Sequence, residues 1–168
     1  MSRPLLRTFA LCSTLVTLSA QDAWDALVRG TDARTPTEER AGFHLPPGFE
    51  IQLVASEPDI GKPMNLAFDA KGRLWVTSTV EYPFPVADGT KGRDSVKVLA
   101  GIGEDGKATS ITTFVDGLNI PIGLYPYKDG VIAFDIPTIK FHRDTDGDGK
   151  ADTAKNSMAR SVATTPTA

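Results

Sequence analysis

The sequence predicts an all-β protein made of repeated four-stranded sheets, and three observations lead to this fold class. Fifteen glycines and twelve prolines in 168 residues favour strands joined by tight turns over long helices. Beyond Leu45 the apolar residues recur with a period of two, which is typical of half-buried strands. The third observation is an internal repeat that appears at two different spacings.

The repeat consists of two matched pairs of segments. Pro63–Leu66 and Gly72–Val76 match Pro121–Leu124 and Gly130–Phe134 at an offset of 58 residues. Val96–Val98 and Asp105–Ala108 match Ile139–Phe141 and Asp148–Ala151 at an offset of 43 residues. An insertion of 15 residues in the first copy, within 82–92 and its flanks, reconciles the two offsets.

Four-stranded units that recur every 40–60 residues indicate a β-propeller, whose units bury their sheet faces against one another. We therefore predict a partial β-propeller of about two four-stranded blades, preceded by a short N-terminal helix. A small β-sandwich in which the repeat arises by chance is the alternative. Four segments supply the first strands in chain order: Glu50–Ala55, Met64–Phe68, Arg73–Ser78 and Ser95–Leu99.

Residues 1–20 resemble an export signal. Arg3 and Arg7 precede a short apolar run over 9–16, and small residues follow at Ser19 and Ala20. The apolar run is too short to span a bilayer. We expect an exported protein, periplasmic or extracellular, cleaved after Ala20 or after Ser19, although a buried first element is an alternative.

The remaining domain boundaries are placed where the pattern of polar and apolar residues changes. Residues 21–43 form a polar lead-in, in which Thr35, Pro36 and Glu38 make a capping box that predicts a helix over about 36–42. The first blade is predicted at 44–100 and the second, with its acidic loop, at 101–152. Residues 153–168 lack alternation and are expected to be a disordered or truncated tail.

The most informative motif is an acidic loop of the form D-x-D-x-D-G-x-x-D. Carboxylates at positions one, three, five and nine, with the carbonyl at seven, offer the hard oxygen ligands that Ca²⁺ prefers. The predicted metal ligands are Asp144, Asp146, Asp148, Lys150 through its backbone carbonyl, and Asp152. Lys155 stands where an EF-hand has a bidentate glutamate, so a hairpin loop is predicted. A solvated acidic turn is the alternative.

Other classes of function find little support. The formal net charge of −3 and the lack of a basic cluster argue against nucleic-acid binding. The single cysteine, Cys12, excludes a Cys-x-x-Cys-His haem motif in this chain. The first-copy loop keeps only Asp105 of the acids that match the predicted ligands, so no metal is expected there. His44 and His142 are expected at the surface or on an edge strand, and Trp75 in the core.

Several motifs carry a family resemblance, which covers about residues 35–153. They are Leu45–Phe49, Ala55–Pro58, Phe68–Val76, Glu81–Pro83 and Asp144–Asp152. Together they resemble the N-terminal domain of the membrane-bound dehydrogenase family of planctomycetes and verrucomicrobia, which looks like the six-bladed propeller of quinoprotein glucose/sorbosone dehydrogenases. The resemblance implies oxidation of a sugar or alcohol with pyrroloquinoline quinone as electron acceptor, and with calcium orienting the quinone or bracing the fold.

The chain departs from that family in what it lacks. About four blades and the region of the catalytic histidine have no counterpart here, so no catalytic or quinone-binding residue is assigned and enzymatic activity stays open. We expect an N-terminal fragment that is inactive as an isolated chain. The competing hypothesis is a non-catalytic module that binds a glycan or a protein and uses calcium structurally. A degraded gene is a third possibility.

Overall fold

The structure is a computed structural model that describes residues 32–157. Residues 1–35 and 36–168 form separate units, and the description below concerns the second unit. The predicted signal peptide at 1–20, the first part of the lead-in (21–31) and the end of the predicted tail (158–168) lie outside the described residues. One short helix, α2, spans Pro36–Ala41, which confirms the helix predicted from the capping box.

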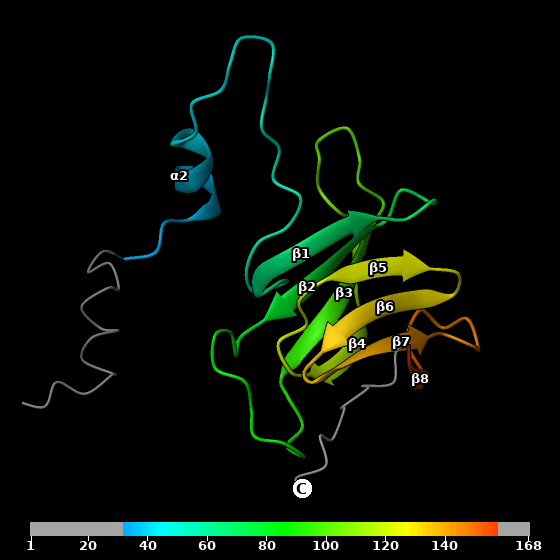
Figure 1. The fold of residues 1–168 in the computed structure, drawn as a ribbon. Helices are drawn as coiled ribbons and strands as arrows, with labels where there is room; N and C mark the ends of the chain where they lie inside the picture. The colour runs from blue at the N-terminus through cyan, green and yellow to red at the C-terminus, as the bar shows by residue number, and fades with distance from the viewer. Residues whose placement is uncertain (1–31, 158–168) are drawn as a thin grey trace, which may run out of the picture. The chain divides into compact units, whose positions relative to one another are not determined.

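The described chain is mostly β and forms two four-stranded antiparallel sheets, each with its strands in sequence order (Figure 1). The all-β prediction is confirmed at this level, and neither sheet closes on itself. The first sheet contains β1 (Lys62–Phe68), β2 (Leu74–Thr79), β3 (Asp94–Ala100) and β4 (Ser110–Leu118). The second contains β5 (Leu124–Tyr127), β6 (Gly130–Asp135), β7 (Thr138–Arg143) and β8 (Thr153–Asn156).

Three expectations about the strands need correction. Glu50–Ala55 is not a strand, although the Val54 carbonyl accepts a hydrogen bond from the Ala108 amide at 3.1 Å. β4 lies beyond residue 100 but pairs with β3, so the first sheet crosses the predicted blade boundary. β8 lies in the predicted tail. Its four residues are all exposed, so no apolar alternation marked it, and pairing with β7 holds it.

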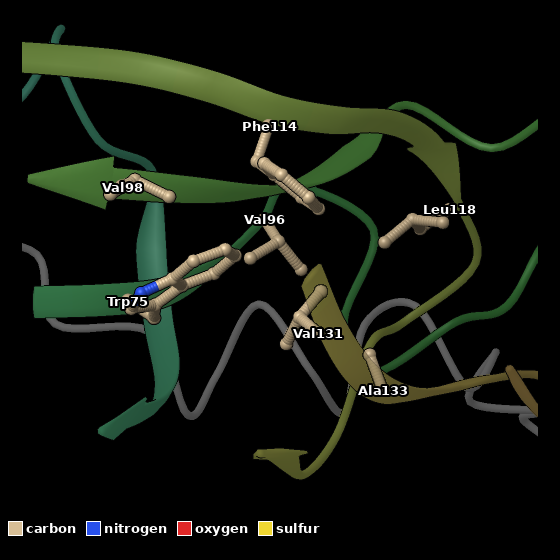
Figure 2. Close-up of a cluster of buried hydrophobic side chains, with 7 residues drawn as sticks. All are labelled: Trp75, Val96, Val98, Phe114, Leu118, Val131 and Ala133. Carbon is tan, nitrogen blue, oxygen red and sulfur yellow. The ribbon is translucent and has the colours of Figure 1, made fainter. Parts of the chain in front are cut away.

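The main core lies between the two sheets (Figure 2). Its buried members are Trp75, Val96, Val98, Phe114 and Leu118 from the first sheet, with Val131 and Ala133 from the second. The rings of Trp75 and Phe114 meet edge to face with centroids 4.7 Å apart. Because such burial is the main stabilising term in folding, this cluster holds one sheet against the other.

The opposite face of the first sheet has its own apolar cover. Leu74, Val76 and Leu99 are buried there. The chain that precedes β1 packs on them through Val54, Ala55 and Ile60, and three residues near the β3–β4 hairpin complete the cover: Ile102, Ala108 and Ile111. The segment expected to be a strand thus serves as a lid on this face.

In the second strand of each sheet, the residues that correspond by cross-strand pairing differ by one position from those that the sequence match pairs. Trp75 lies opposite Val98, and Ile132 lies opposite Phe141. Val98 and Phe141 are 43 residues apart, so Trp75 corresponds to Ile132 rather than to Ala133, which the sequence alignment pairs with it. A shift of one residue exchanges the two faces of a strand. The alignment of Gly72 with Gly130 was therefore wrong for this strand, because the β1–β2 and β5–β6 turns differ in length.

A buried carboxylate joins the end of β2 to the connection between the sheets. Asp94 is fully buried, and its oxygens accept hydrogen bonds from the Thr79 hydroxyl at 2.6 Å and the Val80 amide at 2.7 Å. The amides of Glu81 and Ile120 also donate to it, at 3.2 and 3.0 Å. Asp94 therefore satisfies backbone donors that directly follow β2 and a backbone donor in the connection between β4 and β5.

No helix within residues 32–157 combines the length and the apolar character needed to cross a bilayer.

Candidate metal centre

The acidic loop connects β7 to β8 at the edge of the second sheet. Arg143 ends β7 and Thr153 begins β8, so the nine residues between them reverse the chain. Gly147 and Gly149 adopt φ angles of 84° and 87°, a region that side chains disfavour. The two glycines permit the tight turns of this loop. Strands flank the loop, as the sequence predicted for a hairpin.

Three of the predicted ligands converge. Asp144, Asp146 and Asp152 each offer a carboxylate oxygen, and these oxygens lie within 4.8 Å of one another. Asp148 is not part of this group, and its Oδ1 accepts the Lys150 amide at 2.8 Å. The structure thus brings together three of the four predicted acidic ligands.

Backbone amides hold the carboxylates in place. Asp144 accepts from the amides of Gly147 and Gly149 at 2.6 and 2.9 Å. Asp152 accepts from the hydroxyl and the amide of Thr145 at 2.8 and 2.9 Å. These two bonds from Thr145 lower the pKa of Asp152 below its ordinary value. The Asp152 carboxylate is therefore ionised at neutral pH and available to a cation.

The loop is attached to both sheets. The Ala151 amide donates to the Phe114 carbonyl of β4 at 2.7 Å, and the Asp152 amide donates to the Arg143 carbonyl at 2.9 Å. Arg143 also forms a forked ion pair with Asp129 in the β5–β6 turn. This ion pair lowers the pKa of Asp129 and raises that of Arg143. An ion bound in the loop would therefore act on the junction between the sheets.

The corresponding loop of the first sheet retains the turn. The Lys107 amide donates to Asp105 Oδ1 at 3.0 Å, as the Lys150 amide does to Asp148, 43 residues later. Gly106 also has a positive φ, 78°, like Gly149. The two loops therefore share a local conformation, and what the first has lost is the acids that flank it.

A cavity of about 460 Å³ adjoins the loop. Asp144, Gly147 and Gly149 line one side of it, and the basic side chains Lys71, Arg73 and Lys128 also line it. Arg73 is paired with Asp69 at 2.7 Å, whereas Lys71 and Lys128 form no ion pair with a residue of the described range. The lining therefore combines three basic side chains with two acidic ones, Asp129 and Asp144, beside the acidic loop.

His142 is not the surface residue that the sequence suggested. It is 4% exposed on β7, an inner strand of its sheet, and its Nε2 has no hydrogen-bond partner among the described residues. Burial lowers its pKa despite the nearby Asp135 carboxylate. Glu81 is a second buried group that sequence reasoning missed, since one of its oxygens also lacks a described partner. The Glu81–Pro83 motif does not itself indicate that Glu81 is buried, and no pattern around His142 does so for that residue.

The fold and the loop define a two-sheet β protein with one acidic hairpin site. A family model described as "Domain of unknown function (DUF7133)" matches residues 35–162, and the chain belongs to this family. The match covers both sheets and the acidic loop. No curated protein and no solved structure matches the chain.

Proposed function

We propose that this chain is a calcium-binding part of an exported β-propeller, in which the ion braces the second sheet against the first. The observation that carries this proposal is the convergence of three carboxylates, from Asp144, Asp146 and Asp152, on a loop bonded to β4. The ligand set is all oxygen, which favours Ca²⁺ over zinc or copper. Three carboxylates this close repel one another, and a dication removes that repulsion.

The arrangement of the sheets supports the propeller. Both sheets are four-stranded and antiparallel with strands in chain order, and their faces pack on a common core. The first strands of the two sheets, β1 and β5, lie beside each other. Such a repeat of sheets around adjoining first strands is the arrangement of propeller blades. We propose that each sheet is one blade.

Calorimetric titration of the full chain with CaCl₂, after removal of metal with a chelator, tests the calcium site. We expect one saturable site that disappears in the double variant Asp146→Ala, Asp152→Ala. The matched control is Asp105→Ala in the first-copy loop, which should bind as the unaltered chain does. Folding of every variant is checked by circular dichroism. A folded chain that gives no heat above dilution, or a site that survives the double substitution, would contradict the proposal.

A dehydrogenase role is a further proposal, supported by the family resemblance and by the basic cavity. Pyrroloquinoline quinone is a tricarboxylate, and Lys71, Arg73 and Lys128 would hold its carboxylates beside the acidic loop. When bound, the quinone would accept a hydride from a sugar or alcohol. The lining includes two acids, Asp129, engaged by Arg143, and Asp144, engaged by backbone amides, so we assign no general base. We therefore propose that the isolated chain is inactive.

Quenching of tryptophan fluorescence by added quinone, with and without calcium, tests this role. Binding should weaken at least tenfold in Lys71→Ala, Lys128→Ala and remain in Lys107→Ala, a lysine outside the cavity. Unchanged quenching in the cavity variant would remove the support for a quinone site. A chain that binds calcium but no quinone would favour the non-catalytic module that binds a glycan or a protein.

We also propose that the protein is exported, on the basis of the residues that precede the described range. Arg3, Arg7 and the apolar run at 9–16 support it. A fusion of residues 1–30 to a reporter that is active only outside the cytoplasm should be active, and Leu15→Arg should abolish that activity. An inactive fusion that is stably produced would argue for a buried first element instead.

A further inference from the structure

The second sheet has an apolar outer face that residues 32–157 leave partly exposed. Ile132 lies opposite both Tyr125 and Phe141, and Phe134 lies opposite Ile139, so these side chains share one side of the sheet. The outer face consists of Tyr125, Tyr127, Ile132, Phe134, Ile139 and Phe141. Tyr125 is 63% exposed and Tyr127 is 40% exposed, and each of the other four is only partly buried. Apolar patches of this kind mark interaction surfaces.

The repeat shows what kind of surface the outer face is. Cross-strand pairing gives Ile132, Ile139 and Phe141 three counterparts in the first sheet, which are Trp75, Val96 and Val98. All three counterparts belong to the buried core between the sheets. The outer face therefore corresponds to the face through which the first sheet already packs on the second.

The existing interface between the sheets joins two unlike faces. The first sheet contributes the large rings of Trp75 and Phe114, and the second contributes the smaller side chains of Val131 and Ala133. Because side chains alternate along a strand, Val131 and Ala133 lie on the opposite side of β6 from Ile132, on the inner face of the second sheet. Stacking that continues in the same sense would place a face of this small aliphatic kind on the outer face.

The side chains of the outer face suit such a partner. Tyr125 and Tyr127 stack with ring centroids 6.4 Å apart, and Tyr127 meets Phe141 at 5.5 Å. These rings supply bulk on one side of the sheet, as Trp75 and Phe114 do in the existing interface. Small aliphatic side chains on the partner leave room for such rings, so that the contact can reach the packing density of a protein interior.

Within residues 32–157 no copy of this chain offers a free face of the required kind. The inner face of the second sheet is buried against the first sheet. The corresponding face of the first sheet, with Leu74 and Val76, lies under the segment that includes Val54, Ala55 and Ile60. The partner is therefore a different sheet, and the chain alone should not associate through its outer face.

We propose that the outer face is the docking surface for a further four-stranded sheet of the same repeat, whose contact face carries small aliphatic side chains as Val131 and Ala133 do. Continuity with the existing interface carries this proposal, because the second sheet would hold the partner sheet as the first sheet holds the second. The proposal rests on the assignment of each sheet as one blade and deepens it by naming what the second blade packs against. It requires neither calcium nor quinone.

A tethered sheet of known sequence tests the docking surface. Residues 119–157, which include the whole second sheet, are appended as a duplicate to the C-terminus of the full chain, and the tether keeps their effective concentration high. Tyr125→Phe and Tyr127→Phe in the duplicate alone ensure that labelling of these tyrosines reports on the original sheet. Acetylation of the original Tyr125 by N-acetylimidazole, followed by mass spectrometry, should slow at least tenfold when the duplicate docks.

Two comparisons make the labelling specific. Tyr82, which is 43% exposed in the loop after β2, serves as the internal standard and should react at the same rate in every chain. The matched control is a duplicate that also carries Val131→Asp and Ala133→Asp, which place two charges on its contact face. With this duplicate the original Tyr125 should react as fast as in the unextended chain. Circular dichroism measures whether the duplicate adds strand structure.

Three results would overturn the proposal. The first is an unchanged reaction rate of Tyr125, whether or not the duplicate folds, because a complementary face should bind and order the tethered sheet. The second is equal protection by the duplicate with Val131→Asp and Ala133→Asp. The third is a dimer of the unextended chain that Tyr125→Glu dissociates in sedimentation, which would assign the outer face to a second copy. The calcium titration is independent of all three, so failure of docking and failure of the calcium site are distinguishable.

Discussion

The side-chain oxygen of Asn65 accepts a hydrogen bond from the backbone amide of Gly123, and the two residues hold the same position in the two copies of the repeat. Asn65 lies in β1, and Gly123 directly precedes β5. This bond therefore joins the first strand of one sheet to the start of the other. Gly123 has a φ of 82°, so the chain enters β5 through a conformation that suits glycine.

Loss of this bond should weaken the junction between the sheets. We expect Asn65→Ala to lower the free energy of unfolding by about 1 kcal/mol, because the Gly123 amide loses its acceptor. Urea denaturation measures the change. Asn156→Ala, at an exposed position of β8, serves as the control and should have little effect. Equal effects of the two substitutions would contradict a special role for the junction.

The loop geometry separates two aspartates that the sequence treats alike. Asp152→Asn should reduce calcium affinity more than tenfold, because Asp152 belongs to the converging group. Asp148→Asn should cost less, because Asp148 lies outside that group and an asparagine oxygen can still accept the Lys150 amide. Calorimetry on both variants checks this order. A greater loss of calcium affinity in Asp148→Asn than in Asp152→Asn would show that Asp148 is a ligand, as the sequence predicted.

Asp94 should be among the polar side chains most costly to remove. In Asp94→Ala the Thr79 hydroxyl and the amides of Val80 and Ile120 lose their acceptor, and the Glu81 amide keeps only the Thr79 hydroxyl oxygen, so we expect the free energy of unfolding to fall by about 4 kcal/mol. Asp116→Ala is the control. Its ion pair with Lys91 is exposed, and its removal should change stability by less than about 0.5 kcal/mol. Chemical denaturation of both variants provides the comparison.

Asp69 should make the stability of the first sheet sensitive to acid. Partial burial alone would raise the pKa of Asp69, but hydrogen bonds from the Trp75 indole and from Arg73 outweigh it and lower the pKa to about 2. A lowered pKa stabilises the fold above the ordinary value of 3.8, and that contribution is lost as the pH falls from about 4 to about 2.

Asp69 should account for about 2 kcal/mol of the acid-dependent loss in the unaltered chain, and the loss should be smaller by that amount in Asp69→Asn. Urea unfolding at several pH values in chelator measures it, which keeps the calcium loop out of the comparison. If Asp69→Asn shows the same acid dependence as the unaltered chain, other carboxylates cause it.

Gly130 should tolerate no side chain. A Cβ at this position would lie 1.9 Å from the His142 carbonyl oxygen on β7, and the backbone cannot yield without breaking the pairing of β6 with β7. We expect Gly130→Ala to destabilise the protein by about 3 kcal/mol. At Gly103 the nearest atom is the exposed Asp105 side chain at 3.3 Å, so Gly103→Ala should be close to neutral. Thermal denaturation distinguishes the two.

Apolar alternation predicted β1, β2 and β3, and the spacing of the acids predicted the acidic loop, because these leave local patterns; alternation also marked Glu50–Ala55, which is not a strand. The sequence did not predict β8, whose side chains are all exposed, since only pairing with β7 makes this segment a strand. The sequence also did not predict that Trp75 corresponds to Ile132 rather than to Ala133. Strand register depends on the lengths of the turns, and the similarity of residues does not reveal these lengths. The position of Asp148 outside the carboxylate group likewise depends on the winding of the loop, which the spacing of acids leaves open.

The lid formed by the chain before β1 limits how copies of this protein can associate. A repeat unit with two uncovered faces could add further copies without end and form fibres. Here Val54, Ala55 and Ile60 seal one side of the first sheet, so within the described residues a further sheet can stack only on the outer face of the second sheet. The lid therefore gives the series of stacked sheets a fixed end and a single direction of growth.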